Sequence, residues 1–137
     1  MMKGRELVEF VAKKRIEMIA EETKQIFSGS VANYHLTSDG RAHIVVTWEG
    51  VVIDEEYVET GESWSAPERM REYLLPLVNK ARLVVVVPER HVRAARMRLL
   101  EYNHWWLFYY LVFSYDREGN LKPYGRPRPT SPESGYA

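Results

Sequence analysis

The sequence predicts an α/β fold in which helices flank a mixed β-sheet. Three observations support this prediction. Apolar residues recur with a helical period at the start of the chain, three short β-like segments separated by turns follow, and an uninterrupted apolar run, Leu83–Val87, lies between two further helical segments. The resulting order of elements is α-β-β-β-α-β-α-β. A meander of three strands followed by a helical crossover predicts a mixed sheet covered by helices on both faces.

Length and composition limit what the chain can be. A chain of 137 residues, 45% of them hydrophobic, is expected to form one domain. We assign residues 1–122 to this α/β domain and residues 123–137 to a Pro- and Gly-rich C-terminal tail, which should be irregular or extended. The formal net charge is +0, so the overall field of the protein selects neither a nucleic acid nor a membrane.

Targeting signals and cysteines are missing from the sequence. The chain has no Cys, which excludes disulfides and thiolate metal sites. It shows no signal peptide, and its longest apolar run, residues 105–113, is too short to cross a bilayer as a helix. These features predict an intracellular, cytoplasmic protein without a membrane partner.

The first half of the chain should form a helix and three strands. Residues 5–27 place most of their apolar side chains near one helical face, and Ser28-Gly29-Ser30 should end the helix. Strands are expected at Val31–Thr37, Ala42–Trp48 and Val51–Val58, joined by the turns Ser38-Asp39-Gly40 and Glu49-Gly50. These three strands predict an antiparallel meander.

The second half alternates helices and strands. Ser65-Ala66-Pro67-Glu68 has the pattern of a capping box that begins a helix, and Pro76 should kink or end that helix early. Leu83–Val87 is typical of a central strand buried on both faces, usually a parallel one. A third helix, His91–His104, and a long aromatic strand, Trp105–Ser114, complete the order.

An acidic stretch is the first candidate for function. Acids crowd the third strand and the residues after it, and no Lys or Arg occurs between residues 42 and 68. Strand alternation places Asp54 and Glu56 on one face, where both could bind one Mg²⁺ or Mn²⁺ ion. His43 on the neighbouring strand, or Asp39 in the turn, could complete the site. The alternative is that these acids are solvated charges that discourage edge pairing of the strand.

An arginine row on the third helix is the second candidate. It comprises Arg90, Arg93, Arg96 and Arg98. The first three are three residues apart and drift slowly around one side of the helix. Such a row can contact successive backbone phosphates of a nucleic acid. The alternative is a solvated helix face that balances the acidic stretch.

The aromatic strand is the third candidate. In Trp105–Phe113 both alternating faces are apolar, so a terminal strand of this sequence must be covered. Packing against the rest of the domain would cover it. A homodimer formed across Trp105–Phe113 is the alternative.

The order of elements and several short motifs resemble the core of the PD-(D/E)XK nuclease superfamily, which includes restriction endonucleases and archaeal Holliday-junction resolvases. Glu6 lies in the first helix, and Arg41–Val46 resembles the strand that begins with Pro-Asp, with His43 in the place of the Asp. Ile53-Asp54-Glu55-Glu56 resembles the acid-x-Lys step, with Glu56 in the place of the Lys, and LVVVVPE resembles the fourth strand. The resemblance covers residues 3–114.

This resemblance implies a restriction-endonuclease-like fold and a divalent-metal-dependent endonuclease that hydrolyses phosphodiester bonds of DNA. It implies Glu6, Asp54 and Glu56 as catalytic residues, with Mg²⁺ or Mn²⁺ held by Asp54, Glu56 and His43 or Asp39. The chain lacks the first Asp and the Lys of the motif. The alternative is a catalytically degenerate relative that binds nucleic acid through the arginine row, or a dimeric interaction module.

Overall fold

The computed structural model describes residues 2–102 and 110–124, and it shows an α/β protein with an N-terminal helix and a six-stranded mixed sheet. The elements, in chain order, are α1 (Arg5–Thr23), β1 (Val31–Leu36), β2 (Ala42–Trp48), β3 (Val51–Val58), η1 (Ser63–Ser65), α2 (Arg69–Val78), β4 (Arg82–Pro88), η2 (Glu89–His91), α3 (Val92–Tyr102), β5 (Tyr110–Tyr115) and β6 (Leu121–Tyr124). The predicted order of helices and strands is therefore confirmed, and β6 is added to it.

The strands lie in the sheet in the same order as in the chain. β1, β2 and β3 form the predicted antiparallel meander. β4 is parallel to β3, β5 is parallel to β4, and β6 is antiparallel to β5. The three parallel strands therefore end at one edge of the sheet, which we call the carboxyl edge, and they begin at the opposite amino edge.

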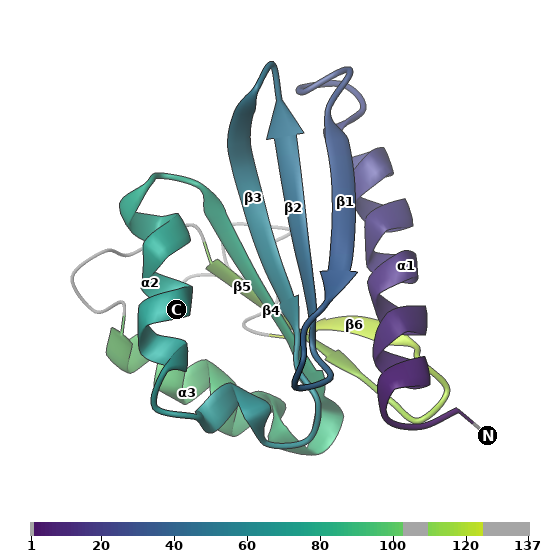
Figure 1. The fold of residues 1–137 in the computed structure, drawn as a ribbon, viewed down its shortest axis with the longest axis vertical. Helices are drawn as coiled ribbons and strands as arrows, with labels where there is room; N and C mark the ends of the chain where they lie inside the picture. The colour runs from purple at the N-terminus through teal and green to yellow at the C-terminus, as the bar shows by residue number, and fades with distance from the viewer. Residues whose placement is uncertain (1, 103–109, 125–137) are drawn as a thin grey trace, which may run out of the picture.

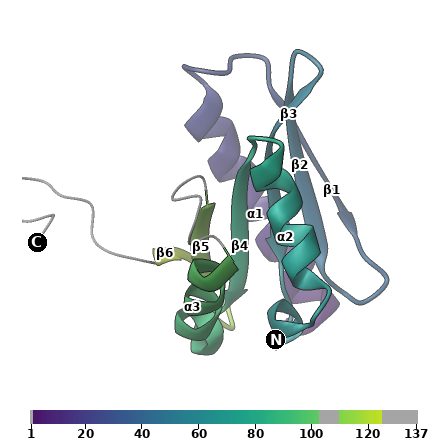
Figure 2. The same cartoon turned by 90° about the vertical axis from the view of Figure 1, so that its left-hand side faces the viewer.

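Helices cover both faces of the sheet, as the sequence predicts. α1 packs on one face, and α2 and α3 pack on the other (Figures 1 and 2). Each face has its own apolar core: Val8, Val11 and Ile19 of α1 belong to the first, and Tyr73, Leu77, Val92 and Leu99 of α2 and α3 belong to the second. β4 contributes to both because its valines are fully buried on either side, as its unbroken apolar run predicts.

Several predicted ends of helices are wrong. α1 ends at Thr23, where the Thr23 hydroxyl donates a hydrogen bond to the Ile19 carbonyl, and irregular turns follow. The predicted capping box does not form. α2 begins at Arg69 with no side-chain cap, and the Ser65 hydroxyl instead donates to the Glu62 carbonyl. Pro76 lies inside α2 and does not end it, because the helix continues to Val78. The backbone N–H that proline lacks removes one hydrogen bond, and only from the last turn.

The aromatic strand is not an edge strand. β5 lies between β4 and β6, so both of its edges are hydrogen-bonded, and Val112 and Phe113 are buried in opposite cores. Pro123 and Tyr124, which the sequence assigns to the tail, are the last residues of β6. The predicted strand segment 105–109 and the tail from residue 125 lie outside the described residues, so the predicted homodimer through Trp105–Phe113 stays a prediction.

In the part of the chain that the structure describes, no helix is long and apolar enough to cross a membrane.

Candidate functional site

Asp54 and Glu56 share one face of β3, as strand alternation predicts, but this face is turned towards α1 and is not solvated. Asp54 is 4% exposed and Glu56 is 0% exposed. Arg15 of α1, which is itself fully buried, reaches Glu56 with Nε at 2.6 Å from Oε1 and Nη2 at 3.1 Å from Oε2. This fork-to-fork geometry is the strongest form of an arginine–carboxylate pair.

Arg82, at the start of β4, binds the same acids from the neighbouring strand. Asp54 and Arg82 are register partners, and Arg82 Nε donates to Asp54 Oδ1 at 2.6 Å. Arg82 Nη2 lies 3.3 Å from Glu56 Oε2 and 3.1 Å from Glu22 Oε1. Glu22 in turn accepts from Arg15 Nη1 at 2.8 Å. We call these five residues, Arg15, Glu22, Asp54, Glu56 and Arg82, the amino-edge cluster.

The amino-edge cluster carries one more carboxylate than guanidinium groups. Asp54 Oδ2 is buried and has no hydrogen-bond partner among the described residues. Burial raises the pKa of Glu56 well above its ordinary value, and the neighbouring charge of Asp54 raises it further, against the opposing effect of Arg15.

The other predicted ligands do not join this pair. His43 lies opposite Tyr57 in the β2–β3 register, on the face away from α1, where its ring stacks on Tyr57 and its Nε2 lies 2.9 Å from Glu55 Oε1. Asp39 binds Arg69 Nη2 at 2.9 Å. The prediction that His43 or Asp39 completes a site with Asp54 and Glu56 is therefore wrong.

Glu6 is also misplaced in the predicted site. It lies exposed in the first turn of α1, whereas the side chain that α1 presents to Glu56 is Arg15. Nine residues of helix separate the two positions, about 14 Å at 1.5 Å per residue. Among the residues described, no group of three or more His, Cys, Asp or Glu side chains is arranged to hold a metal ion. Arginines hold the two central carboxylates of the predicted ligand set, so Mg²⁺ or Mn²⁺ would have to displace a guanidinium to bind there.

A second set of buried charges lies beyond the end of β3. Arg41, 2% exposed, forms a fork with the fully buried Glu59, with Nε to Oε1 at 2.7 Å and Nη2 to Oε2 at 2.9 Å. Glu59 also accepts hydrogen bonds from the hydroxyls of Ser63 and Tyr73. The remaining members join through Arg41 and Arg69. We call the set Asp39, Arg41, Glu59, Arg69 and Glu72 the loop cluster.

The loop cluster fixes the backbone that follows β3. The Glu59 N–H donates to the Val86 carbonyl at 2.8 Å, and the Tyr115 hydroxyl donates to the Glu59 carbonyl at 2.6 Å. Burial, aided by the charge of Glu59, raises the pKa of Tyr115 to about 12, so this hydroxyl stays protonated as a donor. Thr60 and Gly61 are therefore held at a defined position relative to the ends of β4 and β5.

A cavity of about 350 Å³ opens at the carboxyl edge, beside these residues. Four segments line it: the start of α1 and the residues that end or follow β3, β4 and β5. Ligands of α/β proteins commonly bind outside the carboxyl ends of parallel strands. Lys3, Arg90 and Arg117 bring three cations to its wall, and we call the cavity with these residues the basic cavity.

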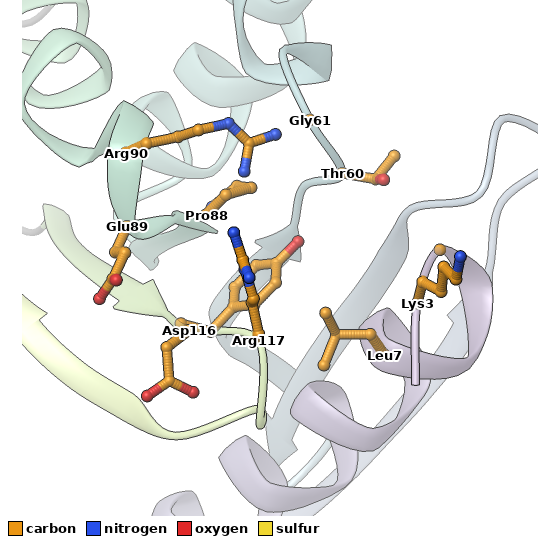
Figure 3. A pocket seen from close by; sticks show the side chains of 11 residues that line it. Lys3, Leu7, Thr60, Gly61, Pro88, Glu89, Arg90, Asp116 and Arg117 are labelled. Carbon is orange, nitrogen blue, oxygen red and sulfur yellow. The ribbon is translucent and has the colours of Figure 1, made fainter. Parts of the chain in front are cut away.

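The acids of the basic cavity are turned away from its cations. Figure 3 shows the guanidinium groups of Arg90 and Arg117 reaching towards each other past Pro88, while the carboxylates of Glu89 and Asp116 point in other directions. Asp116 caps its own turn, because its Oδ1 accepts the N–H groups of Glu118 and Asn120. Within the described residues, no carboxylate lies within 4.0 Å of the side-chain nitrogens of Lys3, Arg90 or Arg117.

The predicted arginine row divides into two kinds of side chain. Arg90 lies in η2 and Arg93 in the first turn of α3, and both are exposed. Arg96 lies 6.0 Å from the ring centre of Tyr124, and Arg98 lies 5.8 Å from that of Trp64 and 3.7 Å from Glu101. Arg90 and Arg93 thus remain available to a ligand, and they continue the basic cavity onto α3.

The sequence contained a signal for one residue that the prediction missed. Val8, Val11, Arg15 and Ile19 follow one another at the spacing of a single helical face, and all four are buried. An arginine inside such an apolar stripe indicates a buried acid as its partner. No local pattern marks Arg82 or Arg117, which become neighbours of the other charges only through strand pairing.

Comparisons with protein-family models, with curated proteins and with solved structures found no match for this chain.

Proposed function

We propose that this protein binds the phosphate backbone of nucleic acid at its carboxyl edge and does not cleave it. The proposed interface consists of the basic cavity and the adjoining Arg93. In this proposal the fold is a restriction-endonuclease-like core in which the acidic strand has become structural. DNA is the expected nucleic acid.

The division of the arginines supports this proposal most directly. Arg15, Arg41, Arg69 and Arg82 are committed to buried or half-buried carboxylates, so they hold the fold together. Lys3, Arg90, Arg93 and Arg117 are exposed along one edge. Backbone phosphates need a row of cations and no precise pocket, and each neutralised phosphate releases counterions.

The proposal is tested by measuring DNA binding with matched charge variants. Fluorescence anisotropy of labelled single-stranded and duplex DNA is expected to show binding by the wild type and at least about tenfold weaker binding by Arg90→Ala/Arg93→Ala. The control is Arg71→Ala/Lys80→Ala, which also removes two exposed cations but none from the basic cavity. Equal losses in both double variants would reduce the binding to a net-charge effect and contradict the interface.

Metal-dependent nuclease activity is the second candidate, and one contact favours it. The Arg82 guanidinium lies against three carboxylates, those of Glu22, Asp54 and Glu56, where a cation is already stabilised. Arg82 is 30% exposed in its side chain, so it is the most accessible cation of the cluster. This candidate expects Arg82→Met to bind Mn²⁺ in calorimetry, and expects wild-type cleavage of DNA with Mn²⁺ that Asp54→Asn abolishes. Absence of both results removes the candidate.

A further inference from the structure

The basic cavity is a half-open hollow at the carboxyl edge. Its wall comes from four separate parts of the chain, and Leu7, Pro88 and Tyr115 add apolar surface to it. Its volume of about 350 Å³ is at the lower end of the range for small-ligand sites. A continuous strand can lie across a cavity of this shape, but only the end of a strand can bring to its wall a phosphate with three free oxygens.

The cations of the basic cavity come from three separate segments of the chain, and two of them, Arg90 and Arg117, reach towards each other. Lys3 precedes α1, Arg90 lies in η2 after β4, and Arg117 lies in the turn between β5 and β6. Figure 3 shows the side chains of Arg90 and Arg117 on two sides of one space, with Leu7 below Lys3 on the α1 side. The three free oxygens of a phosphate monoester can accept hydrogen bonds from both guanidinium groups at once, whereas an internal diester offers only two free oxygens.

We propose that the basic cavity binds the terminal nucleotide of a nucleic-acid strand through its phosphate monoester. This inference rests on the proposed function and deepens it, because it names the part of the nucleic acid that the carboxyl edge selects. A terminal phosphate carries about −1.5 to −2 charges at pH 7 and three acceptor oxygens, whereas each internal diester carries a single charge. The apolar surface of the cavity suits the sugar and base that carry the phosphate.

Hydrogen bonds fix the backbone on two sides of the basic cavity. Thr60 and Gly61 follow Glu59, whose carboxylate accepts four hydrogen bonds, from Arg41, Ser63 and Tyr73. Arg117 lies in a turn closed by the Asp116 carboxylate and by the Gly119 N–H, which donates to the Asp116 carbonyl at 3.0 Å. Both sides of the cavity are therefore preorganised, which lowers the entropy cost of binding.

The experiment compares three single-stranded oligonucleotides of one sequence in anisotropy competition: 5′-phosphorylated, 3′-phosphorylated and unphosphorylated. We expect the wild type to prefer one phosphorylated end by about tenfold or more, since two or three charge-assisted hydrogen bonds are added. Arg90→Ala and Arg117→Ala should each remove most of this preference. Arg93→Ala, which lies outside the cavity, should weaken all three oligonucleotides alike and leave the ratio unchanged.

The preference should also depend on pH in a way that identifies the ligand group. The second ionisation of a phosphate monoester has a pKa near 6, so the preference should shrink as the pH falls from about 7.5 to 5.5, while binding of the unphosphorylated strand changes less. If Arg93→Ala lowers the ratio of binding to the phosphorylated and unphosphorylated oligonucleotides as much as Arg117→Ala does, the preference reflects only general charge attraction, and the inference is overturned.

The outcomes separate this inference from the proposed function. Equal binding of all three oligonucleotides by the wild type overturns the terminal-phosphate site and leaves backbone binding intact. If no oligonucleotide binds, the proposed function fails, and calorimetry with thymidine 5′-monophosphate and 3′-monophosphate against thymidine decides the cavity. If the wild type binds either monophosphate and Arg117→Ala abolishes that binding, the cavity site is supported. If neither monophosphate binds, the terminal-phosphate site is overturned together with the proposed function.

Discussion

The amino-edge cluster and the basic cavity use arginine in opposite ways. At the amino edge, Arg15 and Arg82 are paired with three carboxylates, and Asp54 and Glu56 are almost wholly buried. At the carboxyl edge, Arg90 and Arg117 are exposed, and the nearby acids Glu89 and Asp116 point away from them. The same residue type is thus paired within the protein in the amino-edge cluster and presented to solvent in the basic cavity.

The difference teaches where charge signals function in this fold. A buried carboxylate with an arginine fork has its acceptor capacity filled, so an ion would first have to displace the guanidinium. An exposed arginine beside a cavity has free donors, so it adds binding energy without breaking a contact. In this fold the acidic stretch of β3 therefore marks a structural cluster, and the exposed arginines without a carboxylate partner mark the proposed binding surface.

The largest expected effect comes from breaking the amino-edge cluster at Arg15. Arg15→Met leaves Glu56 buried without its main partner, and removal of one member of a buried ion pair typically costs about 3 to 5 kcal/mol. Guanidinium chloride unfolding followed by circular dichroism should show this loss in the free energy of unfolding. The double variant Arg15→Met/Glu56→Leu should recover most of it, because no buried charge is then left unpaired.

Lys24→Ala is the matched control for Arg15→Met. Lys24 lies in the turn after α1 and pairs with Glu21 at 3.8 Å, with both side chains largely exposed. Exposed pairs contribute at most about 1 kcal/mol, so this variant should unfold close to the wild type. Equal stability of Lys24→Ala and Arg15→Met would show that the amino-edge cluster does not hold the fold.

The second expected effect, on binding, sharpens the contrast between the amino-edge cluster and the basic cavity. The salt dependence of DNA binding should weaken for Arg117→Ala, with the slope of log Kd against log salt reduced by about 0.7 to 0.9 for the phosphate contact that is lost. Arg117→Ala should leave the free energy of unfolding within about 0.5 kcal/mol of the wild type, as for most surface substitutions. Anisotropy titrations at four salt concentrations measure the slope, and an unchanged slope would remove Arg117 from the interface.

The fold was predictable because its elements are marked locally. The alternating strands, the turn at Asp39-Gly40 and the apolar run of β4 each carry a signal within a few residues, and the structure confirms the meander and the parallel crossover. The ends of α1 and α2 were not predictable in the same way. The Ser65 hydroxyl can either cap the N-terminus of α2 or donate a hydrogen bond to the Glu62 carbonyl. Which of the two forms depends on the backbone path of η1.

The candidate site was predictable only in part, because its pairings are long-range. Strand alternation correctly put Asp54 and Glu56 on one face, and it also puts His43 opposite Tyr57 once the β2–β3 register is known. The sequence did not contain that register, nor the pairing of Asp54 with Arg82 across β3 and β4. Arg90 was identified from its spacing in the arginine row, whereas Lys3 and Arg117 join it only through the meeting of α1 with the β5–β6 turn (Figure 1).

A third and smaller effect concerns pH and Glu56. Because the folded protein raises the pKa of Glu56, the folded state binds a proton more tightly than the unfolded state does. Stability should therefore fall as the pH rises from the unfolded value near 4.3 to the raised folded value, by about 1.4 kcal/mol for each unit of the shift. Glu56→Gln cannot titrate, so its unfolding free energy should lack this decline.

In the acid range the free energy of unfolding should change with pH in the opposite direction because of Glu22, and this serves as an internal control for the Glu56 effect. Arg15 and Arg82 lower the pKa of Glu22 against the effect of its burial, so Glu22 contributes stability above its ordinary pKa that is lost as the pH falls below it. Wild type and Glu56→Gln should both lose stability there. Urea unfolding at pH 4, 5, 6.5 and 8 separates the two limbs, and parallel curves for the two proteins above pH 5 would contradict the raised pKa of Glu56.

The smallest expected effect tests the link between the loop cluster and the basic cavity at Tyr115. The Tyr115 hydroxyl donates to the Glu59 carbonyl, and its residue lines the basic cavity, so one bond joins the loop cluster to the basic cavity. Tyr115→Phe should cost about 1 kcal/mol of unfolding free energy, as a single buried hydrogen bond does. It should also weaken the preference for a terminal phosphate by a few-fold while leaving binding to the unphosphorylated strand unchanged, because Thr60 and Gly61 lose their tether but every cation remains. A stability loss without any change in that preference would show that the frame of the cavity is held by the Arg41–Glu59 pair alone.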